Sequence, residues 1–208
     1  MVSSAPNFRI PQLWKGERVF ILGGGPSLMD EDLSLIYNEK VIGVNDAFKL
    51  GDWVDVAWST DCQWLKWNEK QLDGFKGIKL SAPPCRCKHD VIKIARKHQS
   101  GICTDPSLVY WSRSSGASAI NLAYHLGAVE VVLLGFDMKM RGNNHNWHSN
   151  HQHTPRPTIY QQLFIKQFDK IAEDAKSLGL KIINATCDTD LVAFPRQTLQ
   201  EVVDGKGN

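Results

Sequence analysis

Three continuous apolar runs place the strongest constraint on the fold of this chain. They lie in the candidate strands at residues 18–22, 40–44 and 129–134, directly after Arg18, Lys40 and Glu130. A strand with one face in water alternates apolar and polar side chains, so an unbroken apolar run indicates a strand covered on both faces, as in a parallel sheet. Further candidate strands are residues 54–58, 78–80 and 181–183.

Amphipathic segments lie between these strands. The clearest are residues 115–126 and 158–178, which are followed by Gly127 and Gly179. Glycine just past the last helical turn is the usual left-handed cap, so we expect a helix over each segment. Strands that alternate with helices predict an α/β fold with a doubly wound, mostly parallel Rossmann-like sheet and helices on both faces.

Composition narrows the function classes. The chain has 24 Lys and Arg against 22 Asp and Glu, which gives no general argument for nucleic acid or membrane binding. No apolar run approaches the roughly 20 residues of a membrane span, and no signal-peptide core is evident, so we expect a cytoplasmic protein with reduced cysteines. We expect one nucleotide-binding domain over residues 1–208, with its core at about 18–194 and tails at 1–17 and 195–208.

A glycine-rich turn, GGGPS at residues 23–27, follows the first predicted strand. Glycine permits positive φ and close backbone approach, and proline suits the first position of a helix. A helix that starts at the carboxyl edge of a parallel sheet suits a phosphate, although a tight turn without a ligand has the same pattern. The candidate phosphate-binding residues are Gly23, Gly24, Gly25 and Ser27.

The glycine turn is not a standard nucleotide motif. The lysine loop of nucleoside triphosphatases is absent, and Leu28 stands where the dinucleotide fingerprint needs its third glycine. Asp46 lies near the distance expected of the ribose-binding acid of that fingerprint. These features disfavour NAD without excluding it.

Polar residues follow several other predicted strands or start the helix at residue 115. Carboxyl ends of parallel strands meet at one edge of the sheet, so we expect these residues to share one cleft. The two serines could instead only cap the helix. Besides Thr60, the candidate nucleotide-binding residues are Asn45, Asp61, Ser114, Ser115, Gly116 and Asp137.

Four histidines, His145, His148, His151 and His153, lie within nine residues. Histidine is the commonest acid or base near neutral pH and the commonest transition-metal ligand. Three interpretations stay open: a catalytic histidine, a metal site, and a solvated loop.

For the remaining polar and aromatic groups we expect structural roles rather than functional ones. The segment from Cys85 to His89 gives only weak evidence for a metal site, because its C-x-C has no distant partner pair. The basic run between Arg86 and Lys97 is expected to be a solvated face, although it could guide an anionic acceptor. We expect the tryptophans Trp53, Trp58, Trp64 and Trp67 to pack in the core, with Trp64 and Trp67 on one buried helical stripe.

Five segments together resemble a known family. ILGGGPSL, VIGVNDAF, SSGASAINLAYHLGAVEVVLLGFDM, WHSNHQHT and KIINATCDTDLVAF occur in this order between about residues 19 and 194. The order resembles that of bacterial CMP-sialic acid-dependent sialyltransferases. It also resembles the related family that contains archaeal 6-hydroxymethylpterin diphosphokinase and flagellin-modifying glycosyltransferases. In overall appearance the chain is most similar to compact phage-encoded members of this family that have no assigned activity.

The resemblance implies roles for individual residues. Asn45 would bind the ribose or base, the turn at 114–116 would contact the cytidine and phosphate side, and His148 would be the catalytic base. Gly24 replaces an asparagine that touches the donor in that family. Two phosphate-binding tyrosines have no evident counterpart, so Lys139 or Arg141 could neutralise the phosphate instead.

We therefore expect a glycosyltransferase-like enzyme that binds a nucleotide or nucleotide-sugar donor and transfers the glycosyl group to an unidentified acceptor hydroxyl. The acceptor could be a small molecule, a glycan, a protein or a modified nucleobase. Glycosyl transfer would require no cofactor, although Mg²⁺ stays possible. The alternatives are a Mg²⁺-dependent, pterin-type diphosphokinase that uses ATP, and a nucleotide-binding protein without catalytic activity.

Overall fold

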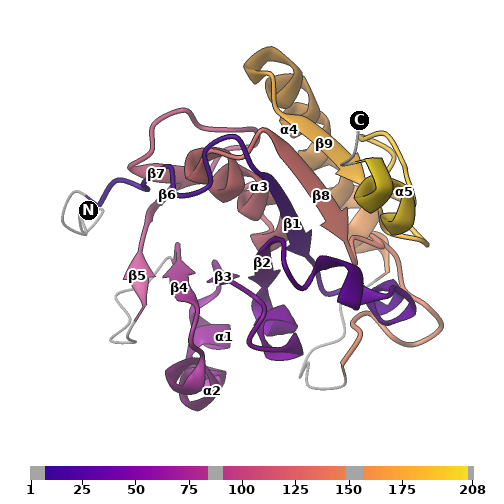
Figure 1. Ribbon diagram of the computed structural model, residues 1–208, viewed down its shortest axis with the longest axis horizontal. Helices are drawn as coiled ribbons and strands as arrows, with labels where there is room; N and C mark the ends of the chain where they lie inside the picture. The colour runs from indigo at the N-terminus through magenta and orange to yellow at the C-terminus, as the bar shows by residue number, and fades with distance from the viewer. Residues whose placement is uncertain (1–7, 84–90, 149–156, 206–208) are drawn as a thin grey trace.

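The computed structural model describes residues 8–83, 91–148 and 157–205. Within them, seven strands form one sheet in the order β5-β4-β3-β2-β1-β8-β9, and every neighbouring pair is parallel (Figure 1). Two further short strands pair with each other in a separate small sheet. The strands of the large sheet are β1 (Arg18–Leu22), β2 (Lys40–Val44), β3 (Val56–Ser59), β4 (Ile78–Ser81), β5 (Ile92–Lys93), β8 (Glu130–Leu134) and β9 (Lys181–Asn184), and those of the small sheet are β6 (Ala95–Lys97) and β7 (Leu108–Tyr110).

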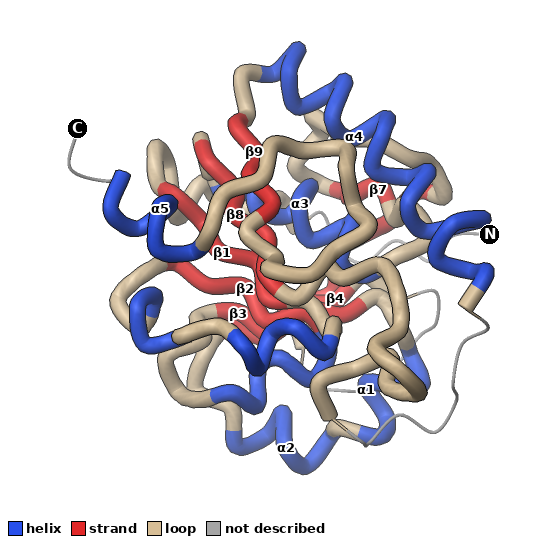
Figure 2. Tube along the Cα trace, turned by 90° about the vertical axis from the view of Figure 1, so that its right-hand side faces the viewer, coloured by secondary structure: helices blue, strands red, loops and turns tan. Residues whose placement is uncertain are grey.

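Helices cover both faces of the large sheet. They are α1 (Cys62–Trp67), α2 (Glu69–Gly74), α3 (Ser115–Leu126), α4 (Ile165–Leu178) and α5 (Leu199–Asp204). In Figure 2, α4 lies above the strands, and α1 and α2 lie below them. The expected doubly wound, mostly parallel α/β fold is therefore confirmed.

Alternate side chains of each strand enter different core clusters. Val19 and Ile21 of β1 pack with α3 and α4, whereas Phe20 and Leu22 pack with α1, α2 and α5. Burial on both faces explains why the strand sequences are continuously apolar.

Most sequence expectations for individual elements are confirmed. All six expected strands are present, although the third covers Val56–Ser59 and not residues 54–58. Gly127 and Gly179 end α3 and α4 with φ of 97° and 71°, as left-handed caps do. The segment expected as one helix from residue 158 is helical throughout, with a π-helical turn, Tyr160–Phe164, directly before α4.

The expectation of tails outside the core is wrong at both ends. Ile10 and Trp14 are buried, and the N–H of Ile10 donates to the carbonyl of Pro106 at 2.9 Å. In α5, Leu199 and Val202 are buried against the sheet. These segments add apolar side chains to the two core clusters, a role that short local patterns do not reveal.

The strand order creates a crevice at one place on the sheet. From β1 the chain builds outward through β2, β3 and β4 to β5, and later returns to place β8 on the other side of β1. The carboxyl ends of β1 and β8 therefore flank a topological switch point, where open α/β sheets bind ligands.

Among the described helices, none is long and apolar enough to cross a bilayer.

Candidate functional site

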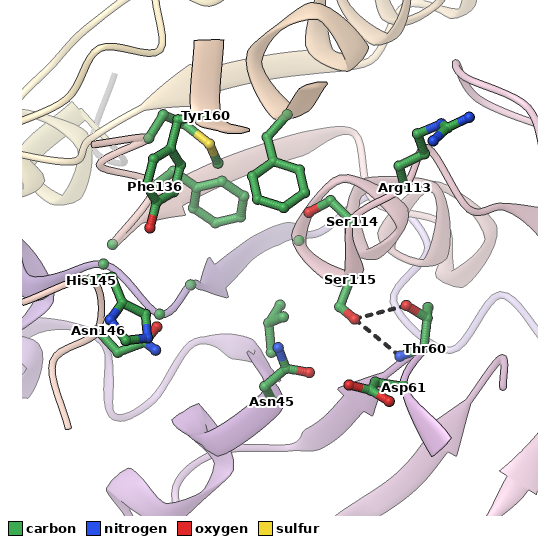
Figure 3. A pocket seen from close by; sticks show the side chains of 18 of the residues that line it. Asn45, Thr60, Asp61, Arg113, Ser114, Ser115, Phe136, His145, Asn146 and Tyr160 are labelled. Carbon is green, nitrogen blue, oxygen red and sulfur yellow. Dashed lines mark hydrogen bonds between the residues drawn. The ribbon is translucent and has the colours of Figure 1, made fainter. Parts of the chain in front are cut away.

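A pocket of about 750 Å³ opens at this switch point (Figure 3). Its walls come from the loops after β1, β2, β3, β7 and β8, from Arg96 of β6, from the start of α3, and from the π-helical turn before α4. Nine of the ten residues expected to bind a nucleotide line it, and they are Gly23, Gly24, Gly25, Asn45, Asp61, Ser114, Ser115, Gly116 and Asp137.

The three glycines of the turn leave room for the protein's own chain. A Cβ on Gly23 would lie 2.5 Å from the carbonyl oxygen of Gly135, and one on Gly24 would lie 2.6 Å from the Asn146 amide. A Cβ on Gly25 would overlap the carboxylate of Asp137. None of the three glycines has positive φ, so the expected left-handed backbone is wrong and close packing explains the residue type.

The glycine-rich turn does not lead into an open helix N-terminus, because the carboxylate of Asp137 binds to it. Asp137 Oδ2 accepts from the N–H of Ser27 at 2.9 Å, and Oδ1 accepts from its hydroxyl at 2.5 Å. The expected helix is only a five-residue 3₁₀ turn, Pro26–Asp30. Ser27 is fully buried and does not line the pocket. Burial raises the pKa of Asp137 despite the hydrogen bonds from Ser27, which favour the ionised form.

The start of α3 is open towards the pocket. Ser114 caps the helix, with its hydroxyl accepting from the N–H of Ala117 at 3.4 Å. The Ser115 hydroxyl bonds the N–H and hydroxyl of Thr60 at 3.1 and 2.8 Å. Within the described chain, the N–H groups of Ser115 and Gly116 have no partner. A 12-residue helix with free N–H groups and its positive dipole end at a pocket suits an anion.

Asn45 lies at the carboxyl end of β2 with φ of 50°. Its Oδ1 accepts from the Ser59 hydroxyl at 2.8 Å, whereas its Nδ2 has no hydrogen-bond partner in the described part of the chain. Asp61 follows β3 and caps α1, with Oδ1 accepting from the N–H of Gln63 at 2.8 Å. Both side chains therefore combine a structural bond with a position on the pocket wall.

Backbone strain concentrates around this pocket. Asn45, Ser112, Arg113 and Met138 are the non-glycine residues with positive φ in the described ranges, and all but Ser112 line the pocket. Such conformations persist only where surrounding structure enforces them, and they cluster at functional sites.

The histidine loop does not present the expected residue. His148 does not line the pocket; its side chain is 9% exposed, and Nε2 lies 3.3 Å from Asp46 Oδ2. His145 lines the pocket instead. The neighbouring donors and acceptors fix the orientation of the Asn146 side-chain amide. In this orientation the amide oxygen accepts from His145 Nε2 and the amide nitrogen donates to the Gly24 carbonyl, both at 3.1 Å. Figure 3 draws His145 and Asn146 side by side.

Two other expectations concern polar sites: a ribose-binding acid at Asp46 and a metal site formed by histidines or cysteines. Asp46, the possible ribose-binding acid, is buried, contacts Lys49 and His148, and does not line the pocket. No group of three metal-binding side chains occurs in residues 8–83, 91–148 and 157–205. His151, His153, Cys85, Cys87 and His89 lie outside these ranges.

The cations expected to neutralise a phosphate already have acidic partners. Lys139 pairs with Asp188 at 2.5 Å and with Asp190 at 3.4 Å. Arg141 pairs with Asp30 at 2.6 Å and does not line the pocket.

Sequence reasoning missed four prominent pocket residues. Arg96 had been assigned to a solvated basic face, and Trp111, Tyr160 and Phe164 had no assigned role. The spacing of Tyr160 and Phe164 by four residues was a usable signal, because it puts both rings on one helical side. In Figure 3 the Tyr160 hydroxyl points towards the side of the pocket that holds His145 and Asn146.

Core packing is confirmed for two of the four tryptophans named above. Trp58 and Trp64 are buried, but Trp67 is 37% exposed, so Trp64 and Trp67 do not form one buried stripe. The expectation that all cysteines are reduced is also wrong, because Cys62 is disulfide-bonded; Cys103 and Cys187 are free.

Comparisons with known proteins place the fold. No protein-family model and no curated protein sequence matches this chain. A solved structure of the sialyltransferase CstII from Campylobacter jejuni, in complex with the substrate analogue cytidine-5'-monophosphate, is similar with a TM-score of 0.55. The two chains are 14% identical, and the match covers 88% of this chain and 86% of the other. This chain therefore shares its fold, nearly throughout, with a sialyltransferase.

Proposed function

We propose that this protein is a glycosyltransferase-like enzyme that binds a nucleotide-activated sugar in the switch-point pocket and transfers the glycosyl group to an acceptor hydroxyl. The observation that carries the proposal is the open start of α3 on a 750 Å³ pocket at the carboxyl edge of the sheet. The fold shared with a sialyltransferase whose structure was solved in complex with a nucleotide supports it.

The proposed donor pose follows from the polar groups of the pocket. One phosphate of the donor lies at the N–H groups of Ser115 and Gly116, where the helix dipole stabilises negative charge. The Asn45 amide nitrogen donates to the ribose or base, since the opposite end of that amide is bound to Ser59. The glycine turn shapes the pocket wall and does not itself hold the phosphate, because the N–H of Ser27 in this turn already donates to the Asp137 carboxylate.

The proposed reaction is a substitution at the anomeric carbon. The acceptor oxygen forms a bond to this carbon as the bond to the phosphate oxygen breaks, and the phosphate leaves with the electron pair. The helix start stabilises that charge, and the acceptor proton goes to a base. We propose His145 as the base in place of His148, because His145 lines the pocket and its bond to Asn146 orients the ring. A neutral ring that donates through Nε2 accepts the proton at Nδ1.

A matched pair of variants tests the assignment of the base. His145→Ala should lose about 10²- to 10⁴-fold in turnover with donor affinity nearly unchanged, because proton removal matters in the transition state. His148→Ala should lower the melting temperature, since Asp46 loses a buried partner, but keep turnover within about tenfold. A deep loss of turnover confined to His148→Ala would reverse the assignment.

The products distinguish the proposed reaction from the two alternatives. A glycosyltransferase should release free nucleotide slowly from sugar nucleotides in water and faster with acceptor present. A diphosphokinase should need a divalent cation and convert ATP to AMP, and a binding protein should do neither. A screen of sugar nucleotides by thermal shift identifies the donor first, since ligand at 100 times its Kd adds about 2.7 kcal/mol to the stability.

A further inference from the structure

The pocket wall contributed by β6 carries a guanidinium group without an acidic partner. Arg96 is half-buried, and in the described chain it forms no ion pair. Its Nη1 donates to the carbonyl of Thr60 at 2.9 Å, and its guanidinium carbon lies 4.2 Å from the centre of the Trp111 ring. Burial lowers the pKa of Arg96, while the nearby Asp61 raises it. A half-buried cation with one backbone bond has spare donors and lacks a counter-ion.

Arg96 is held in a defined position next to the start of α3. The indole N–H of Trp111 donates to the Thr60 hydroxyl at 3.1 Å. This hydroxyl bonds to the Ser115 hydroxyl at 2.8 Å (Figure 3). Thr60 thus contacts the guanidinium, the indole and the helix start at once. The stacked ring fixes the plane of the guanidinium, so little side-chain entropy remains to be lost on binding.

The charges of the pocket favour a second anionic group at this position. Lys139 is neutralised by two aspartates, but Arg113 has no partner in the described ranges and directly precedes the cap of α3. The acidic neighbour Asp61 is engaged at the start of α1. One phosphate at the start of α3 leaves the charge of Arg96 uncompensated. Two adjacent phosphates compensate both the positive end of the α3 dipole and the charge of Arg96.

We propose that Arg96, stacked on Trp111, forms a second anion subsite that binds the β-phosphate of a nucleoside diphosphate. The donor class is therefore a sugar activated by a nucleoside diphosphate and not by a monophosphate. The guanidinium presents two parallel N–H groups to phosphate oxygens, a geometry that lysine cannot supply. This inference rests on the proposed function, because it takes the nucleotide to lie in the same pocket.

The test compares mono- and diphosphates of cytidine, uridine, guanosine and adenosine with the full chain by calorimetry at fixed ionic strength. For the preferred base, the wild type should bind the diphosphate about tenfold tighter or more, as expected for charge-assisted hydrogen bonds. Arg96→Gln should lower diphosphate affinity to the monophosphate level and leave monophosphate affinity within about threefold. Arg96→Lys should fall in between.

Lys97→Gln is the matched control, because it removes the same charge from the next residue of β6, which is exposed and does not line the pocket. It should leave both affinities unchanged. The melting temperature of ligand-free Arg96→Gln should equal or exceed that of the wild type, since the variant no longer buries an uncompensated charge.

The outcomes separate the two proposals. Equal affinities for mono- and diphosphates in the wild type, or a diphosphate preference that survives Arg96→Gln, would overturn the second subsite while leaving nucleotide binding established. A parallel loss of both affinities in Arg96→Gln would make Arg96 part of a single phosphate site and also overturn it. Binding of no nucleotide at all would overturn the proposed function together with the subsite.

Discussion

Replacing Asn45 with alanine and with glycine separates its backbone role from its side-chain role. Asn45 has φ of 50°, and an L-residue in this left-handed region carries a cost of about 1–2 kcal/mol. Asparagine reduces the cost by local hydrogen bonding, and glycine does not incur it. The bond from the Ser59 hydroxyl to Asn45 Oδ1, at 2.8 Å, contributes about 0.5–1.5 kcal/mol.

The two variants should therefore differ in stability. Asn45→Ala loses the hydrogen bond, at about 0.5–1.5 kcal/mol, and adds the roughly 1 kcal/mol of left-handed cost that asparagine avoids, so the fold is destabilised by about 1.5–2.5 kcal/mol. At about 2–4 °C per kcal/mol for a chain of this size, the melting temperature should fall by about 3–10 °C. Asn45→Gly loses the same bond but relieves the backbone, so its melting temperature should stay within about 3 °C of the wild type.

Thermal unfolding followed by circular dichroism measures the first difference, and calorimetry with the best nucleotide measures binding. Both variants lose the pocket-facing amide, so both should bind about 5- to 150-fold more weakly, as expected for 1–3 kcal/mol. Equal melting temperatures for the alanine and glycine variants would refute the argument from φ. Wild-type affinity in both variants would make Asn45 a structural turn residue.

Three further perturbations test the packing around the pocket and the electrostatics of the sheet. Gly25→Ala should destabilise the fold by about 1–3 kcal/mol in urea titrations, because the new Cβ overlaps Asp137, whereas Gly74→Ala, with nothing within 4 Å, should not; equal stabilities would contradict the packing argument. Ser27→Ala should lower stability by about 1–3 kcal/mol by removing a buried bond to Asp137, yet leave nucleotide Kd unchanged, and a large loss of affinity at wild-type stability would return Ser27 to the binding site. Burial alone would raise the pKa of Glu130, but hydrogen bonds and charges from Lys181 and Arg18 lower this pKa overall. Ionised Glu130 therefore stabilises the fold at pH values above the ordinary glutamate pKa. This contribution is lost as the pH falls through the depressed pKa of the folded state. The stability difference between neutral and acidic pH should shrink in Glu130→Gln, and an unchanged difference would show that other carboxylates carry the acid sensitivity.

The sequence by itself determined six of the nine strands in the described residues, the two long helices and the edge of the sheet where the pocket opens. These features depend on neighbours along the chain: apolar runs mark strands covered on both faces, and Gly127 and Gly179 end helices wherever those helices pack. Because the carboxyl ends of parallel strands share one edge, Asn45, Asp61 and Asp137 could be grouped before their positions were known.

Only the tertiary structure decided which side chains face the pocket. The carboxylate that closes the glycine turn comes from 110 positions away, and the threonine that holds Trp111 comes from 51 positions away. His145 and His148 are equivalent in local pattern, yet one lines the pocket and the other faces Asp46. Arg96 belongs to a run of basic residues that looks solvated in sequence, and only its stacking on Trp111 turns it inward. The direction of a loop side chain is set by partners that folding brings together, so no pattern of nearby residues contains it.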